Sequence, residues 1–123
     1  MKVSSLFANR QRGHHYEALA ESYLKRQGLF PVTRNFHARG GEIDLIMKDG
    51  DTWVFIEVKY RQSESFGSGF EAIDQAKLQR MRKTAFYWLQ QQEINSEMAA
   101  IRFDAVYITP EQYQWAQNIL VEG

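Results

Sequence analysis

The sequence has no cysteine and only two prolines among its 123 residues. The lack of cysteine excludes disulfide scaffolds, thiolate zinc sites and cysteine nucleophiles, and it is typical of a reducing compartment. No apolar run approaches the roughly 20 residues that a membrane-spanning helix needs, and the basic N-terminal stretch lacks the apolar core of a secretory signal. We therefore expect a cytoplasmic protein without a membrane partner.

Net charge is absent as well, because 15 basic side chains balance 15 acidic ones. This balance argues against a protein that is held on nucleic acid or membrane by bulk charge alone. The charges are nevertheless unevenly spread, since an acidic stretch at residues 42–60 lies between basic stretches at residues 1–41 and 61–92. Carboxylates flanked by cations are typical of metal sites that act on phosphates, although ordinary solvated charge gives the same pattern.

The chain does contain enough apolar side chains, 44% of its residues, to fill the core of a single domain spanning residues 1–123. Apolar spacing and turn residues predict two helices and at least four strands. The expected helices are 14–27 and 70–92, the expected strands are 30–37, 42–48, 52–60 and 101–109, a loop covers 61–69, and 113–121 is a strand or a short helix. This order, α-β-β-β-α-β, predicts an α/β fold with a mixed β-sheet flanked by helices.

Charged residues interrupt the most strand-like segment of the chain. Glu57 and Lys59 lie two residues apart, so they share one face of the strand 52–60, while β-branched residues occupy the other face. Burying an unpaired charge is unfavourable, so this pair either forms an ion pair with a neighbouring strand or serves a function.

The preceding strand carries two more carboxylates. Alternation puts Glu42 and Asp44 on one face together with Ile46, and a tight turn at residues 49–51 makes a hairpin with the strand 52–60. The hairpin then places Asp44 roughly opposite Glu57. Clustered carboxylates raise one another's pKa unless a cation neutralises them, and hard cations such as Mg²⁺ prefer oxygen ligands. We therefore expect a site for Mg²⁺ or Mn²⁺, with a lysine nearby to assist an attacking water.

These residues also match a known pattern. Asp44, followed after the hairpin by Glu57-Val58-Lys59, resembles the Asp…(Asp/Glu)-x-Lys signature of the PD-(D/E)xK nuclease superfamily. Most of the chain resembles the YraN family of bacterial proteins, which is similar to archaeal Holliday-junction resolvases. That resemblance is carried by the segments GHHYEALAESYL, TRNFHARGGEIDLI, VFIEVKYR, FGSGFEAIDQAKLQRMRKTAFYWL and RFDAVYI.

The resemblance implies a restriction-endonuclease-like core, with Asp44 and Glu57 as metal ligands and Lys59 as the catalytic lysine. Glu17 matches the place at which an acid on the first helix completes the metal site of related nucleases. Ile43 stands where the superfamily's name has proline, a departure that many members share.

Further residues have expected roles around this centre. Glu42 would position water beside the metal or serve as a further metal ligand, or else pair with Arg34 or Arg39. The expected nucleic-acid contacts are Arg34, Asn35, Arg61 and Lys77, which would bind phosphates without reading base sequence. We expect no zinc site at His14 and His15, because adjacent residues do not share a helix face. Asp104 and Arg102 are expected to form a structural ion pair.

The function that these patterns favour is a Mg²⁺-dependent DNA endonuclease acting on branched or damaged DNA. In-line attack by a metal-activated water would hydrolyse the phosphodiester bond. A resolvase-like enzyme needs two active sites for two strands, so a homodimer is expected. The alternatives are a nucleic-acid-binding module that does not cleave, and an accessory subunit of a DNA-processing complex.

Overall fold

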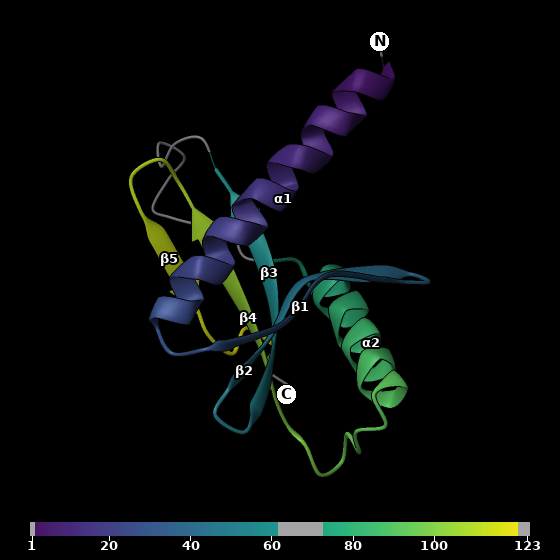
Figure 1. Ribbon diagram of the computed structural model, residues 1–123. Helices are drawn as coiled ribbons and strands as arrows, with labels where there is room; N and C mark the ends of the chain where they lie inside the picture. The colour runs from purple at the N-terminus through teal and green to yellow at the C-terminus, as the bar shows by residue number, and fades with distance from the viewer. Residues whose placement is uncertain (1, 62–72, 121–123) are drawn as a thin grey trace.

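The computed structural model describes residues 2–61 and 73–120, with side chains from residue 13 onward. Its elements, in chain order, are α1 (Lys2–Arg26), β1 (Phe30–Ala38), β2 (Gly41–Asp49), β3 (Thr52–Tyr60), α2 (Gln75–Gln91), β4 (Ala100–Ile108) and β5 (Tyr113–Ala116), as Figure 1 shows. The predicted order is confirmed, and the undecided segment 113–121 contains a short strand. None of the described helices is long and apolar enough to cross a membrane.

The five strands form one mixed sheet in the order β1-β2-β3-β4-β5. All neighbouring strands are antiparallel except β3 and β4, which are parallel and joined by the crossover through α2. A parallel pair requires such a crossover, whereas the other neighbours are connected by shorter segments. The arrangement confirms the predicted α/β class and is consistent with a restriction-endonuclease-like fold.

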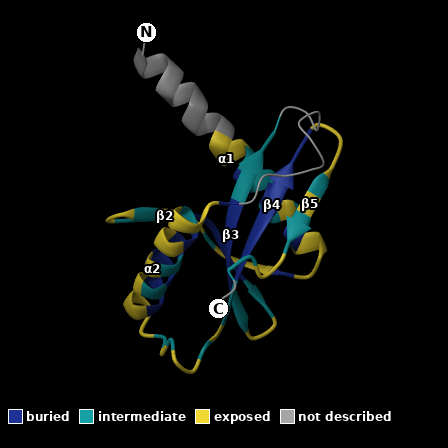
Figure 2. Cartoon of the chain, turned by 180° about the vertical axis from the view of Figure 1, so that it is seen from behind, coloured by how far each residue is buried: buried dark blue, intermediate teal, exposed yellow. Residues whose placement is uncertain are grey.

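Each helix covers one face of the sheet with its own hydrophobic core. On the α1 face, Ala20 and Leu24 pack with Leu45 and Ile56. On the α2 face, the buried side chains are Ile43, Ile46, Phe55, Leu78, Met81, Ala85, Trp88, Leu89 and Phe103, among others. Figure 2 shows that the buried residues concentrate in the central strands β3 and β4. The sheet is therefore the middle of three layers, and each of its faces packs against a different helix.

The helix boundaries differ from the predicted ones at their N-terminal ends. α1 begins at Lys2 rather than at residue 14, and it ends before Gly28, which has a φ of 105°. No large apolar residue lies between Phe7 and Tyr16, so the helical periodicity is interrupted there, but no proline breaks the chain before residue 14. α2 begins at Gln75, because the Asp74 side chain accepts a hydrogen bond from the Lys77 amide as an N-cap. Residues 62–72 of the predicted loop and helix lie outside the described residues.

A close approach between α2 and β2 fixes the distance of this helix from the sheet. A Cβ atom at Gly41 would collide with the side chain of Thr84, so only glycine allows α2 to pack this closely. The hydroxyl of Thr84 donates to the carbonyl of Arg80 within the helix, which keeps this side chain compact. The contact brings the first turns of α2 over the β1–β2 hairpin (Figure 1).

A buried ion pair stabilises the edge of the sheet formed by β4 and β5. Asp104 on β4 is fully buried, and Arg102 binds it through Nε and Nη2 at 3.0–3.2 Å. The indole N–H of Trp115 and the backbone N–H of Asn118 donate to the same carboxylate at 2.9 Å. The predicted structural ion pair is confirmed, and it ties β5 and the segment after it to β4.

Candidate functional site

Asp44 lies where the two central antiparallel strands separate. The pairing of β2 with β3 ends at Leu45 and Ile56, so the next residues, Asp44 and Glu57, face the opening fork. The Asp44 carboxylate accepts a hydrogen bond of 2.8 Å from the backbone N–H of Val58. Its side chain thus takes the place of a backbone acceptor and lies between the strands, close to the plane of the sheet.

The strand alternation predicted for residues 42–48 is wrong at this point. Ile43 packs on the α2 face together with Ile46, whereas Leu45 belongs to the core on the α1 face. Glu42, Asp44 and Ile46 therefore do not share one face. The physical reason is the Asp44 side chain, because a side chain that bonds within the ladder interrupts the regular pleat on which alternation depends.

The neighbouring strand β1 is irregular at the same level. Asn35 lies between the pairs Arg34–Leu45 and Phe36–Ile43, directly across from Asp44, and has a φ of 58°. Asparagine tolerates this left-handed conformation better than other side chains do. Its amide nitrogen is hydrogen-bonded to the ring nitrogen Nε2 of His14 on α1. Asn35, predicted as a phosphate contact, thus connects the sheet edge to the first helix.

Glu57 approaches the fork from the α2 face. Its side chain is buried and forms an ion pair of 2.7 Å with the Nζ atom of Lys77 in the first turn of α2. Burial opposes the charge on Lys77, but the hydrogen bond and charge of Glu57, together with the charge of Asp44, outweigh it and raise the lysine pKa. The lysine that contacts the carboxylates is therefore Lys77.

Glu17 approaches the fork from α1 and is buried. Burial raises the pKa of Glu17, while a hydrogen bond with the Asp44 carboxyl group and the charge of His14 oppose the rise. Helix α1 thus adds a third buried carboxyl group, as the resemblance implied for this position.

Asp44 is the most strongly perturbed acid of the described chain. Burial and then the charge of Glu57 raise its pKa to about 8, with further contributions from Glu17 and Glu42, while the hydrogen bond from Val58 lowers it. A carboxyl group in this state binds a proton or a cation readily, because either one removes the unfavourable buried charge.

The carboxylate oxygens of this cluster suit one kind of divalent ion. Among the described residues, no group of three or more His, Cys, Asp or Glu side chains is arranged to hold a metal ion. Mg²⁺, however, usually binds through one or two carboxylates and takes its other ligands from water and substrate phosphates. Asp44 and Glu57, clustered without an arginine between them, fit a cation of this kind better than a zinc-type cage.

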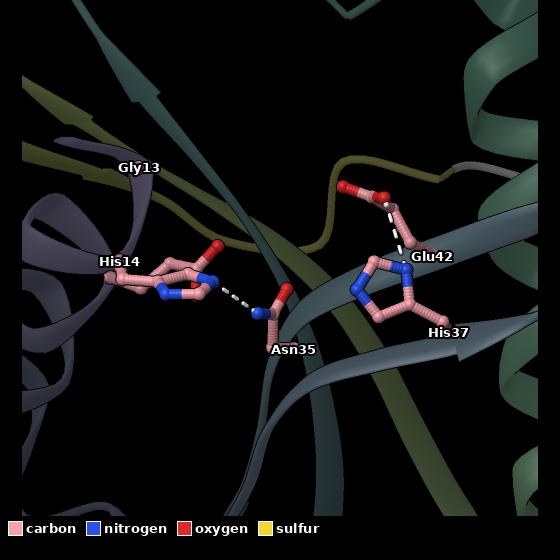
Figure 3. A pocket seen from close by; sticks show the side chains of 6 residues that line it. Gly13, His14, Asn35, His37 and Glu42 are labelled. Atoms are coloured by element: carbon pink, nitrogen blue, oxygen red, sulfur yellow. Dashed lines mark hydrogen bonds and ion pairs between the residues drawn. The ribbon is translucent and has the colours of Figure 1, made fainter. Parts of the chain in front are cut away.

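A pocket of about 610 Å³ opens on the α1 side of this cluster. Gly13, His14, Glu17, Asn35, His37 and Glu42 line it. Figure 3 shows two contacts across it, His14 with Asn35 and His37 with Glu42, and the latter joins Nδ1 to Oε1 at 3.3 Å. Glu42 thus pairs with a histidine on β1 instead of with an arginine. Glu17 and Glu42 line the pocket wall and give the buried carboxylates access to solvent.

His14 is a pocket residue that the sequence interpretation considered only as a zinc ligand. A signal for it existed, because His14 precedes Glu17 by three residues and so lies on the same face of the helix. His37 carried a weaker signal, since nothing in the sequence paired it with Glu42 before the register of the hairpin was known.

The remaining predicted residues lie around the cluster without entering it. Lys59 is half-buried on the same face of β3 as Glu57, and its ammonium group makes no ion pair within the described residues. Arg34 forms an ion pair of 2.9 Å with Glu21 of α1. Arg61 follows β3 directly, and its guanidinium group donates to the Tyr60 carbonyl at 3.1 Å.

Comparison with known proteins places the chain in one family. The model of "Uncharacterised protein family UPF0102" matches residues 16–108, which include all the acids of the site. A UPF0102 protein of Photobacterium profundum is 47% identical over 98% of this chain and 99% of its own length. UPF0102 proteins of Vibrio campbellii and Aliivibrio fischeri are 47% and 39% identical, over 96% and 93% of this chain and 98% and 94% of their own. The resemblance to the YraN family is confirmed, and the chain belongs to the UPF0102 family.

Proposed function

We propose that this protein is a metal-dependent endonuclease that hydrolyses phosphodiester bonds in DNA. The observation that carries the proposal is Asp44, a buried carboxyl group at the fork of two strands whose pKa is raised to about 8 by burial and by neighbouring acids. Strongly perturbed acids in a cleft cluster at functional sites, where burial and neighbouring charges tune their affinity for protons and cations. In a purely structural role, an arginine would be expected to neutralise it.

The residues of the cluster take the following roles in this proposal. Asp44 and Glu57 hold a Mg²⁺ or Mn²⁺ ion, and Glu17 completes its surroundings from α1. Such an ion lowers the pKa of bound water and neutralises charge on the phosphate. Lys59 assists the attacking water, and Glu42, at the solvent-accessible pocket, orients water that enters the site.

The substrate in this proposal is branched or damaged DNA in the cytoplasm. Arg34, Asn35, Arg61 and Lys77 surround the cluster and supply contacts to phosphates. Arg34 would exchange its exposed pair with Glu21 for a phosphate at little cost, because surface ion pairs contribute about 0–1 kcal/mol. A homodimer would place two such sites on two strands of a branched substrate.

A second candidate is a nucleic-acid-binding module that does not cleave, either alone or as an accessory subunit. One observation favours it: Lys77 already neutralises Glu57 in the described structure at 2.7 Å. A module of this kind would keep the fold and bind DNA without using Asp44.

A cleavage assay separates the two candidates. The purified protein is incubated with branched, flapped and linear DNA in Mg²⁺ or Mn²⁺, beside Asp44→Asn and Lys59→Ala. Asp51→Asn is the matched control, because Asp51 is an exposed acid in the turn of the same hairpin. Cleavage by wild type and Asp51→Asn that is lost in the other two variants supports the enzyme. Binding without cleavage, equal in all four proteins, supports the module.

A further inference from the structure

A second hollow lies beside the carboxylate site, between α2 and the turn that joins β1 to β2. Its volume is about 520 Å³, and its lining includes Arg39, Gly40, Arg80, Lys83 and Tyr87. We call it the basic groove. Thr84, which packs closely against Gly41, also lines this groove, so the contact that positions α2 helps to shape it.

The basic groove is continuous with the carboxylate site. An intermediate hollow of about 330 Å³ is lined by His37, Glu42, Lys77 and Arg80, together with neighbouring residues. It shares His37 and Glu42 with the pocket beside Glu17, and it shares Arg80 with the basic groove. The three hollows therefore adjoin one another, from the pocket beside Glu17 to the basic groove along α2.

The two ends of this path carry opposite charge. Arg39, Arg80 and Lys83 are exposed, and within the described residues none of them forms an ion pair. The described lining of the basic groove contains no acidic side chain. Arg34 and Lys77, in contrast, are neutralised by Glu21 and Glu57. Uncompensated cations in a concave surface attract a polyanion, and arginine recognises phosphate geometry especially well.

An aromatic side chain stands at the far end of the basic groove. Tyr87 is 48% exposed, its ring lies 6.4 Å from that of Phe36, and its hydroxyl accepts a hydrogen bond from Gln91. The two contacts hold the ring in place while half of it remains open to solvent. Unpaired bases stack on such rings, whereas the bases of a duplex are already stacked on one another.

We propose that the basic groove binds a single-stranded segment of DNA that continues from the cleavage site, with its phosphates on Arg39, Arg80 and Lys83 and a base stacked on Tyr87. The position of the segment relative to the scissile bond rests on the proposed function, but binding itself does not. The substrate class that follows is DNA with an unpaired strand next to the cleaved bond.

Fluorescence anisotropy in EDTA tests binding without cleavage. The probes are a labelled oligothymidine of about 16 nucleotides and a blunt duplex of equal length. Wild type should bind the single strand about 10-fold more tightly than the duplex. The double variant Arg80→Ala/Lys83→Ala should lose about 10-fold and lower the slope of log K against log salt by about 1.4, since each single-strand phosphate contact contributes about 0.7. Lys25→Ala/Arg26→Ala, which removes two exposed cations at the end of α1, is the matched control and should bind as wild type does.

Substitution of the aromatic residue tests the stacking contact separately. Tyr87→Ala should weaken single-strand binding about 10-fold, while Tyr87→Phe should retain it, because the ring and not the hydroxyl contacts the base. Circular dichroism confirms that each variant is folded. Equal loss in Tyr87→Phe and Tyr87→Ala would contradict stacking.

The outcomes distinguish this inference from the proposed function. Three results would overturn the inference, whether or not the protein cleaves DNA. These are equal affinity for duplex and single strand, equal affinity of the Arg80→Ala/Lys83→Ala variant and wild type, and displacement of the probe by polyglutamate as effectively as by unlabelled oligothymidine. Single-strand binding through the basic groove in a protein that cleaves no DNA would uphold the inference and refute the proposed function.

Discussion

Two buried aspartates of this sheet have opposite surroundings. Asp104 on β4 is 0% exposed and receives hydrogen bonds from Arg102, Trp115 and the Asn118 backbone. Asp44 on β2 is 8% exposed, and it accepts a hydrogen bond from the backbone N–H of Val58. Other carboxyl groups, not an arginine, surround it.

We interpret this difference as that between a structural carboxylate, Asp104, and the functional carboxylate that we propose Asp44 to be. A buried charge contributes to a stable fold when its partners replace the water that it loses, and Asp104 has such partners. Asp44 has one backbone donor and no arginine partner among the described residues, and its pKa is raised, so the folded chain favours a proton or a cation at this carboxyl group. Burial alone is thus a poor guide to function in this fold, whereas burial without compensation points to the site.

The largest expected effect concerns Asp104. Asp104→Ala leaves the partly buried Arg102 without its main partner and should lower the free energy of unfolding by about 3 kcal/mol. Arg102 retains its contact of 3.1 Å with Asp49, which moderates the loss. Urea denaturation measures the change. A decrease in the free energy of unfolding below about 1 kcal/mol would show that the Asp104 network contributes little to stability. Asp104 would then not be a structural counterpart to Asp44.

The next effect concerns catalysis at Asp44. Asp44→Asn keeps an oxygen for the Val58 amide but loses the negative charge, so DNA cleavage should fall by at least about 100-fold. Single-turnover rates with saturating enzyme measure this loss independently of binding. Asp51→Asn should cleave at the wild-type rate. Full activity of Asp44→Asn would show that the Asp44 carboxylate is not needed for catalysis.

The sequence predicted that Asp44 lies near Glu57, but it did not predict how the Asp44 side chain is placed. The bounds of β3 and the register that sets Asp44 near Glu57 follow from β-branched residues and a tight turn. The break in alternation at Asp44 does not, because a side chain that replaces a backbone acceptor leaves no mark in a hydrophobic pattern.

The same limit applies to the lysine at the site. Sequence spacing favoured Lys59, which shares a strand face with Glu57, whereas the ion pair is made by Lys77 from a helix that follows it in the chain. Its reach depends on how closely α2 packs on Gly41, a tertiary contact. Local patterns therefore identified Asp44 and Glu57. Lys77 was expected near them as a phosphate contact, but its ion pair with Glu57 became visible only in the fold.

The pH dependence of stability should reflect Asp44. The folded chain holds a proton with a pKa of about 8, whereas the ordinary value is 3.8. The free energy of unfolding should therefore fall as the pH rises from about 4 to 8 and level off above pH 8, because the unfolded chain releases this proton first. Glu17, whose pKa is also raised, adds to the same trend.

Removal of the Asp44 charge should reduce this slope. Asp44→Asn should be more stable than wild type by at least about 1.4 kcal/mol at pH 8 and nearly equal to it at pH 4, since each pKa unit between 3.8 and about 8 corresponds to 1.36 kcal/mol. Urea denaturation at both pH values provides the measurement. Parallel pH profiles for the two proteins would mean that the Asp44 carboxylate is compensated after all.

The smallest expected effect concerns Lys77. Lys77→Met leaves Glu57 without its cation and should lower the free energy of unfolding by about 1 kcal/mol in EDTA. Addition of Mg²⁺ should stabilise this variant more than wild type, because the ion then meets an unpaired carboxylate. Thermal unfolding with and without Mg²⁺ measures both effects. Arg80→Met, one turn along α2, is the control and should show neither.

Binding of Mn²⁺, measured by calorimetry on the DNA-free protein, tests the central claim most directly. Wild type and Asp51→Asn should bind the ion and release protons at pH 7, because the ion displaces the proton held at the Asp44 cluster. Asp44→Asn should show neither heat of binding nor proton release. Equal binding by Asp44→Asn and wild type would contradict the assignment of these carboxylates as a metal site.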